Sequence, residues 1–290
     1  MSRRYDCSDP MERTRGVAEA VAAVRRGELL VLPTDTVYGI AADAFNPAAV
    51  AALLDAKGQD RATPPSVLVG SVRAAQALLE DTGTYGQDLI DEFWPGALTL
   101  VCRANPNLTW DLGETKGTVA VRMPMHPLAL EVLKETGPLA VSGANTRGVP
   151  AARAADEAGK TLGEVVAVYL DDGPSGEGEA SSIVDLTGPV PRLLRAGAIS
   201  EDKIRGVCGV LLSVEDDEDD LLADPAEVVA TEEMAAAEEV AAAEEVVAAE
   251  QAADPAEAAD PAPGTADGTP AAPVSLAKPE GRTGGESAAE

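Results

Sequence analysis

The chain of 290 residues has very few of the side chains that build metal clusters and disulfide frameworks. It contains one histidine, His126, and three widely separated cysteines, Cys7, Cys102 and Cys208, which follow no C-x-x-C or other ligand spacing. One histidine cannot supply a Cys/His zinc set, and dispersed cysteines are typical of a reducing compartment. The sequence therefore predicts no metal site, and we expect all three thiols to be structural.

Aromatic residues and long apolar runs are also scarce. Phe, Trp and Tyr make up 3% of the chain, and the formal net charge is −28. Proteins bind nucleic acids mainly through cationic surfaces and aromatic stacking, so this composition disfavours direct RNA binding. No apolar stretch is as long as a membrane span, and the charged segment around Arg3, Arg4 and Asp6 is unlike a signal peptide. We expect a cytoplasmic location and no membrane attachment.

The negative charge is concentrated at the C-terminal end. Residues 213–290 contain 22 Asp and Glu against 2 Lys and Arg, a net charge of −20, which leaves −8 for residues 1–212. This segment has no aromatic residue and is rich in Ala, Glu and Pro, so it cannot bury enough apolar surface to fold. The sequence predicts a disordered acidic tail over 213–290. An interaction arm for a basic partner is the alternative.

The first two hundred residues alternate between helical and strand patterns. Val17, Ala20 and Val24 recur at helical spacing before Gly27, and the apolar run 29–32 that follows is typical of a buried strand. We expect helices over 14–26, 47–56, 74–79, 127–135, 152–162 and 201–205, and strands over 29–32, 66–69, 98–102, 118–123, 165–170, 182–186 and 192–194. Because short turns join some strands and helices join others, the sequence predicts an α/β domain with a mixed sheet.

A cluster of hydroxyl and carboxylate side chains follows the strand at 29–32. The segment 33–43 reads PTDTVYGIAAD, and its residues Thr34, Asp35 and Thr36 are poor core material because each would need a hydrogen-bond partner if buried. We therefore expect these side chains to face a ligand, between the strand and a glycine turn at Gly39.

Five separated motifs, taken in order along residues 13–207, resemble those of the YrdC-type threonylcarbamoyl-AMP synthases. They are PTDTVYGIAAD at 33–43; KGQDRATP at 57–64; WPGALTL at 94–100 with GTVAVRMP at 117–124; AVSGAN at 140–145 with GVP at 148–150; and SSIVD at 181–185 with LRAG at 194–197. Five motifs in one order are far more specific than any one of them alone. The resemblance implies a single YrdC-like domain over 13–207, in which surrounding helices pack on a twisted mixed β-sheet.

The resemblance also implies an activity. It is the ATP-dependent synthesis of L-threonylcarbamoyl-AMP from L-threonine and bicarbonate, with release of pyrophosphate and with Mg²⁺ accompanying ATP. Downstream threonylcarbamoyl-transfer proteins would then use the product to modify adenosine beside the tRNA anticodon. Such a reaction must hold a zwitterionic amino acid, neutralise a triphosphate and align a carbamate oxygen with the α-phosphorus.

The same resemblance assigns site residues. It implies that threonine contacts Thr34, Thr36, Arg122 and Ser181, and that ATP contacts Lys57, Thr118, Val141 and Arg195. It implies catalytic positions at Lys57, Arg61, Ser142 and Asn145. The planar fork of Arg122 suits the threonine carboxylate, and Lys57 is a mobile point charge that suits a phosphate. Without the resemblance, a surface salt bridge for Arg122 and a helix-end charge for Lys57 remain open.

Two positions depart from the family pattern. The family usually carries Lys-x-Arg and Ser-x-Asn, whereas this chain has Lys57-Gly58-Gln59 and Gly143-Ala144-Asn145. Loss of a charge contact in the transition state costs on the order of a hundredfold in rate. We expect Arg61 or Ser142 to compensate, although in an extended chain Ser142 points away from the face that Gly143 occupies.

Two further hypotheses remain open, the first of them because of these departures. The first is a catalytically weakened paralogue that binds threonine or nucleotide but turns over poorly. The second is a different carbamoyl-group chemistry on the same scaffold, which the intact threonine-side motif disfavours.

Overall fold

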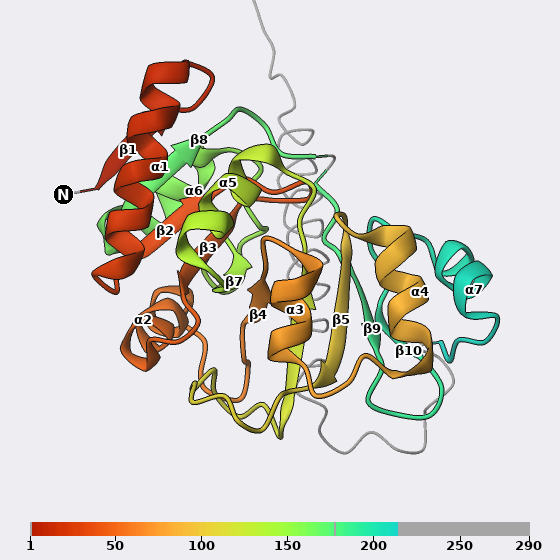
Figure 1. Ribbon diagram of the computed structural model, residues 1–290. Helices are drawn as coiled ribbons and strands as arrows, with labels where there is room; N and C mark the ends of the chain where they lie inside the picture. Colours follow the sequence, from red (N-terminus) through yellow and green to blue (C-terminus); the bar gives the residue numbers. More distant parts are fainter. Residues whose placement is uncertain (1, 177, 214–290) are drawn as a thin grey trace, which may run out of the picture. The chain divides into compact units, whose positions relative to one another are not determined.

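Ten strands form one sheet in the computed structural model, which describes residues 2–176 and 178–213 (Figure 1). Their order across the sheet is β1-β8-β2-β3-β7-β4-β6-β5-β9-β10. The strands are β1 (Arg3–Asp6), β2 (Leu29–Leu32), β3 (Gly39–Asp43), β4 (Ser66–Leu68), β5 (Leu98–Arg103), β6 (Thr118–Arg122), β7 (Leu139–Gly143), β8 (Val166–Asp171), β9 (Ser182–Asp185) and β10 (Arg192–Arg195). The predicted tail lies, from residue 214 onward, outside the described residues.

The sheet is mixed, as the sequence predicts. β8 pairs in parallel with β1 and β2, β4 with β6, and β5 with β9. The pairs β2–β3, β3–β7, β4–β7, β5–β6 and β9–β10 are antiparallel. The α/β class with a mixed sheet is therefore confirmed, and the sheet extends before residue 13 because β1 belongs to it.

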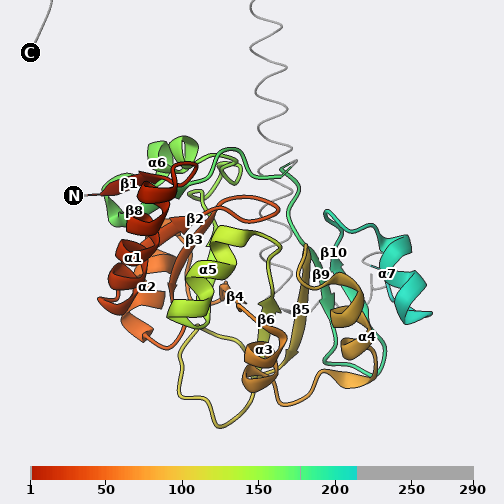
Figure 2. The same ribbon diagram turned by 45° about the horizontal axis from the view of Figure 1, so that its top comes forward.

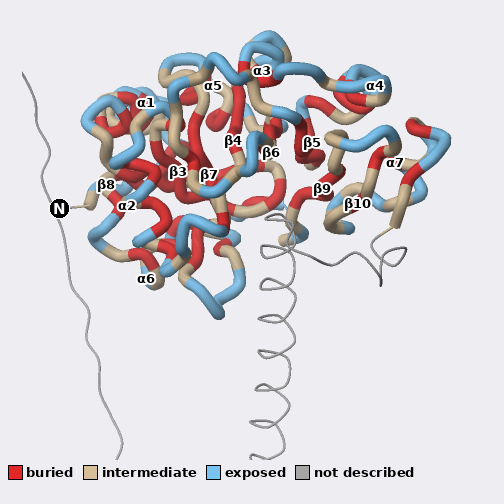
Figure 3. Tube along the Cα trace, turned by 90° about the horizontal axis from the view of Figure 1, so that it is seen from below, coloured by how far each residue is buried: buried red, intermediate tan, exposed pale blue. Residues whose placement is uncertain are grey.

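Helices cover the two faces of the sheet unequally. The helices are α1 (Pro10–Arg25), α2 (Pro47–Lys57), α3 (Val72–Leu78), α4 (Gly83–Phe93), α5 (Pro127–Thr136), α6 (Ala155–Leu162) and α7 (Glu201–Cys208). The helices α1, α3, α4 and α5 lie on one side of the sheet, as both views show (Figure 2). Seen from below, α2 and α6 lie on the opposite side, near β3 and β8 (Figure 3).

Strand alternation explains how both faces of β2 are buried. Leu30 and Leu32 pack with α1 and α5, whereas Leu29 and Val31 pack with α2 and α6. Successive side chains of a strand point to opposite faces, so a continuous apolar run requires cover on both sides. The run at 29–32 was predicted as a buried strand, and this prediction is confirmed.

In the half of the sheet that contains β5 and β6, helices cover one face, and the other face lines a cavity. Leu98 and Leu100 of β5 and Val121 of β6 pack in the core that includes α3, α4 and α7. The alternate residues Thr99 of β5 and Arg122 of β6 therefore point to the opposite face, where they line a cavity. Alternate side chains along β5 and β6 thus face the core and the candidate site in turn.

Some elements differ from the sequence-based expectation. α4 was not predicted, because its sequence GTYGQDLIDEF carries two glycines and buries only Gly86, Leu89 and Ile90. Strands β1, β3 and β7 were also missing from the predicted set. Gly39 begins β3 and makes no turn, so that expectation was wrong. A Cβ on Gly39 would lie 2.6 Å from Val141 Cγ1, so close packing against β7 requires glycine here.

Candidate active site

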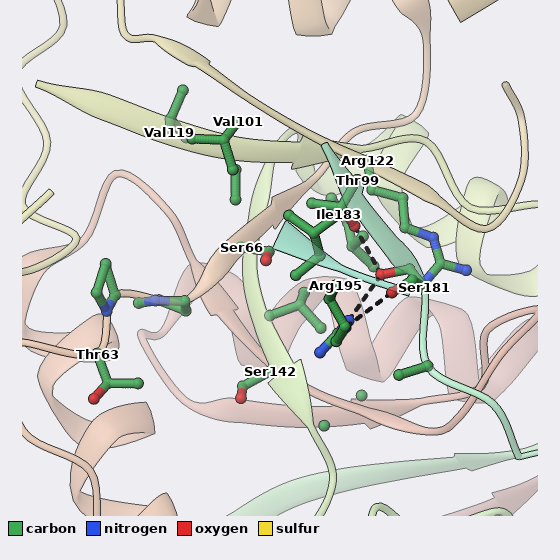
Figure 4. Close-up of a pocket in the computed structure, with 18 of the residues that line it drawn as sticks. Thr63, Ser66, Thr99, Val101, Val119, Arg122, Ser142, Ser181, Ile183 and Arg195 are labelled. Atoms are coloured by element: carbon green, nitrogen blue, oxygen red, sulfur yellow. Dashed lines mark hydrogen bonds between the residues drawn. The ribbon is translucent and has the colours of Figure 1, made fainter. Parts of the chain in front are cut away.

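A cavity, partly open to solvent, lies on the sheet face that β5, β6, β7 and β9 present (Figure 4). It brings together eight of the predicted site residues, namely Thr34, Thr36, Thr118, Arg122, Val141, Ser142, Ser181 and Arg195. In Figure 4, Arg122, Thr99, Ser181 and Arg195 gather at one end, and Thr63 lies at the other.

Arg122 is the buried cation of the cavity wall. Its Nε donates to the Gly96 carbonyl at 2.9 Å, its Nη1 to Thr36 Oγ1 at 2.9 Å and its Nη2 to Asp35 Oδ1 at 2.7 Å. The residue is 6% exposed, and this burial lowers its pKa, an effect that the Asp35 carboxylate opposes. Three of the five guanidinium N–H donors are used in these bonds, so two can serve a ligand.

The Thr34–Thr36 segment forms the partner surface for Arg122. Thr34 Oγ1 donates to the Val37 carbonyl at 2.6 Å and lies 3.0 Å from Thr36 Oγ1. Both residues were expected to face a ligand; they line the cavity, and they are also buried, at 4% and 2% exposure, with hydrogen-bond partners. Their mutual bond fixes the direction in which each hydroxyl faces the cavity.

A second polar group joins three strands. Ser181 Oγ, just before β9, lies 2.8 Å from Thr99 Oγ1 of β5 and accepts from Arg195 Nη2 of β10 at 3.1 Å. Arg195 Nε also donates to the Ser181 carbonyl at 2.9 Å. Thr99 is a site residue that the sequence analysis missed, although a threonine between Leu98 and Leu100 on a buried strand is a signal of a non-core face.

Lys57 and Asn145 lie directly behind the cavity wall. The Lys57 ammonium donates to the Gly143 carbonyl at 2.9 Å and to Asn145 Oδ1 at 2.6 Å. Lys57 ends α2, and Gly58 follows it in the left-handed conformation with φ 69°, which turns the chain so that Gln59 lines the cavity. The two predicted residues are therefore together, and their neighbours Gln59 and Gly143 face the ligand space.

Comparison with known proteins decides the family. Residues 22–197 match the family model Sua5_yciO_yrdC, whose description is telomere recombination. The chain belongs to this family. A Mycobacterium leprae protein named "Putative threonylcarbamoyl-AMP synthase" is 54% identical over 211 residues, which are 73% of this chain and 96% of that protein. The Bacillus subtilis threonylcarbamoyl-AMP synthase is 36% identical over 195 residues, 67% of this chain and 56% of that one.

Solved structures agree with the family. The crystal structure of Pyrococcus abyssi Sua5 complexed with L-threonine has a TM-score of 0.65 and 32% identity, over 68% of this chain and 58% of that one. Escherichia coli YciO has a TM-score of 0.59 at 20% identity, covers 70% of this chain and 99% of that one, and supports the fold alone. The threonylcarbamoyl-AMP synthases carry out nucleotidyl transfer, so this chain is a member of an enzyme family.

Both departures from the family pattern lie at the cavity, because Gln59 and Gly143 line it. Arg61, expected to compensate for Gln59, has its guanidinium on Asp111 at 2.7 Å and is absent from the lining residues. Its side chain is 56% exposed. Ser142, expected to face away from Gly143, lies at the cavity wall together with Gly143, where β7 ends.

The remaining chemistry-bearing side chains lie elsewhere. Cys7, Cys102 and Cys208 are buried, and burial raises the pKa of Cys7 to about 11 and that of Cys102 to about 12. Within residues 2–176 and 178–213, no group of three or more His, Cys, Asp or Glu side chains could hold a metal ion. No helix in that part of the chain is long and apolar enough to cross a membrane.

Proposed function

We propose that this chain synthesises L-threonylcarbamoyl-AMP from L-threonine, bicarbonate and ATP and releases pyrophosphate. The observation that carries the proposal is the buried Arg122 fork, which Thr36 and Asp35 hold at the wall of a polar cavity. A guanidinium with two remaining donors suits a carboxylate through paired hydrogen bonds. Relatives named threonylcarbamoyl-AMP synthase and a family structure solved with L-threonine support it.

The reaction needs two bond-forming steps. The threonine amine attacks the carbon of bicarbonate, which loses water and leaves a carbamate on the amine nitrogen. A carbamate oxygen then attacks the α-phosphorus of ATP, the bond to the β-phosphate bridging oxygen breaks, and pyrophosphate leaves with that electron pair. The protein's part is positioning and charge compensation, because the reactants themselves supply the bonds.

Charge compensation falls to a small set of side chains. We propose that Arg122 holds the threonine carboxylate, and that Thr34, Thr36 and Ser181 surround the rest of the amino acid. Thr118, Val141 and Arg195 would contact the nucleotide at the cavity wall, where Ser142 also lies. Lys57, which Asn145 orients from behind that wall, would supply positive charge for the phosphates. ATP enters as its magnesium complex, because phosphate oxygens and waters are ligands that Mg²⁺ prefers. The product would pass to threonylcarbamoyl-transfer proteins acting on tRNA.

The weakened-paralogue hypothesis gains no support over synthesis. Gln59 and Gly143 do lie at the cavity, yet the residues proposed to hold threonine are all assembled there. A chain silent in the assay described next, with activity gained in the Gln59→Arg, Gly143→Ser double variant, would favour that hypothesis instead.

The test is pyrophosphate release by the full chain with ATP, Mg²⁺, bicarbonate and L-threonine, together with detection of the adenylate product. We expect release to depend on threonine. Arg122→Lys keeps the charge but loses the fork, so it should raise KM for threonine at least about tenfold. The matched control is Arg103→Lys, an exposed arginine at the end of β5, which should change nothing. Threonine-independent release, or none, would refute the proposal.

A further inference from the structure

We propose that Asp35 is a positioning residue that aims the Arg122 guanidinium at the carboxylate of the substrate. This inference rests on the proposed function, because it assigns Asp35 a role in threonine recognition. The Asp35 side chain is 14% exposed and is not among the residues that line the cavity. It can therefore act on the substrate only through the group it touches.

The contacts of Asp35 place it at the outer end of the guanidinium. Its Oδ1 accepts from Arg122 Nη2 at 2.7 Å and from the Met125 backbone N–H at 2.9 Å. Met125 lies just beyond β6, the strand that carries Arg122, so Asp35 joins the segment before β3 to both sides of that strand end. One carboxylate oxygen thus fixes the arginine tip and the chain that follows it.

Three acceptors hold the planar group, and Asp35 is the charged one among them. The Gly96 carbonyl holds Nε, and the Thr36 hydroxyl holds Nη1. The Asp35 oxygen also accepts from the Met125 N–H, so its bond ties the orientation of the fork to the chain that follows β6. The two remaining N–H donors, one on each terminal nitrogen, are directed by these three bonds.

The backbone of Gly176 packs closely against the backbone of Asp35 and Thr36. Gly176 has φ +37°, and a Cβ there would lie 2.7 Å from the carbonyl oxygens of both Asp35 and Thr36. The Gly176 carbonyl accepts from Arg153 Nη2 at 2.9 Å, which ties it to the loop before α6. The Asp35–Thr36 segment is therefore held between the Gly176 backbone and Arg122.

Two roles of Asp35 must be separated, namely placing the guanidinium and neutralising its buried charge. Asp35→Asn keeps an oxygen that can accept from both Arg122 and Met125 but removes the negative charge. Asp35→Glu keeps the charge but lengthens the side chain by one methylene, so the guanidinium must move. Asp35→Ala removes both the charge and the acceptor.

The experiment measures the affinity of the full chain for L-threonine and for L-threoninol, which has an alcohol in place of the carboxylate, by calorimetry. We expect the natural chain to prefer threonine strongly. Asp35→Ala and Asp35→Glu should reduce that preference at least about tenfold, and Asp35→Asn should keep it within about threefold, while affinity for ATP stays unchanged in all three.

The matched control is Asp111→Ala. Asp111 Oδ1 also accepts from an arginine, Arg61 Nη2, at 2.7 Å and from a backbone N–H, that of Gly113, at 3.2 Å, but this pair is exposed and outside the cavity lining. It should keep the full preference for threonine.

The Asp35 variants and the natural chain give different results if the positioning role is wrong and if the proposed function is wrong. Unchanged preference in Asp35→Glu would overturn the proposal, and this variant suffices if Asp35→Ala does not fold. Loss in Asp35→Asn with the preference retained in Asp35→Glu would show that charge neutralisation is the role, and would also overturn it. A natural chain that binds no threonine would refute the proposed function itself, whereas normal discrimination in the natural chain with no effect at Asp35 refutes the positioning role alone.

Discussion

The Lys57 ammonium donates to the Asn145 side-chain oxygen at 2.6 Å, although the two residues are 88 positions apart in the sequence. Both side chains are buried, at 4% and 7% exposure, and Asn145 Nδ2 in turn donates to the Val149 carbonyl. The bond joins Lys57, at the end of α2, to Asn145, just after β7. Gln59 follows Lys57 by two residues, and Gly143 precedes Asn145 by two. The bond therefore holds together the two parts of the cavity wall where the chain departs from the family.

Asn145→Ala should weaken both the fold and the nucleotide end of the site. A buried ammonium that loses a hydrogen-bond partner costs about 1–3 kcal/mol, so the free energy of unfolding in urea should fall by about that amount, and KM for ATP should rise. The control is Asn105→Ala, a turn residue whose amide donates to the Ala77 carbonyl in an exposed position. An equal loss in both variants would contradict a special role for the Lys57–Asn145 bond.

Part of this site follows from sequence pattern alone. Arg122 alternates with Val121 on β6, so its direction is fixed once β6 is recognised as a strand with an apolar face. Thr34 and Thr36 were expected to face a ligand for a different local reason, because buried hydroxyls need hydrogen-bond partners. Both inferences rest on local properties, namely strand alternation in one case and side-chain polarity in the other.

Other parts could not be predicted because they depend on contacts across the sheet. Arg61 follows Gln59 by two residues, yet its guanidinium pairs with Asp111 because the loop between β5 and β6 lies against it. The Glu114 backbone N–H donates to the Arg61 carbonyl at 2.7 Å in the same contact. β3 was missed because GIAAD has no alternation, and its burial depends on the helices that cover both faces of the sheet.

Gln59→Arg should strengthen ATP binding. Gln59 lines the cavity two residues beyond Lys57, so a guanidinium there adds charge-assisted hydrogen bonds to phosphate oxygens. We expect KM for ATP to fall several-fold in the pyrophosphate assay, with KM for threonine unchanged. Gln87→Arg, on the exposed side of α4, is the matched control for the added charge and should have no effect.

A substitution of Arg61 tests whether this residue compensates for Gln59. Its exposed ion pair with Asp111 is screened by solvent and contributes little to stability, so Arg61→Ala should fold normally and keep kcat within about threefold. A hundredfold loss of kcat would instead mean that Arg61 leaves Asp111 and contacts the triphosphate.

His126 should make stability fall between about pH 7 and pH 5. Its side chain is 17% exposed, its Nε2 lies 3.9 Å from Asp172 Oδ2, and its buried Nδ1 has no partner among the described residues. Burial lowers its pKa from the ordinary value of 6.5, more than attraction to Asp172 and Asp35 raises it, and Arg13 lowers it further. The folded protein therefore binds this proton less readily than the unfolded chain.

The sign and the size of the effect follow from linkage. Above about pH 6.5 both states are neutral at His126 and its contribution is complete; as the pH falls, the unfolded state takes up the proton first, and stability is lost by at most about 1.4 kcal/mol per pH unit. His126→Gln should flatten urea-unfolding stability between pH 7 and pH 5.5 while leaving the loss below pH 5, where carboxylates titrate. Because His126 is the single histidine of the chain, its imidazole resonance should titrate below 6.5 in the native protein. A titration above 6.5, or an unchanged slope in His126→Gln, would show that another group controls stability in this range.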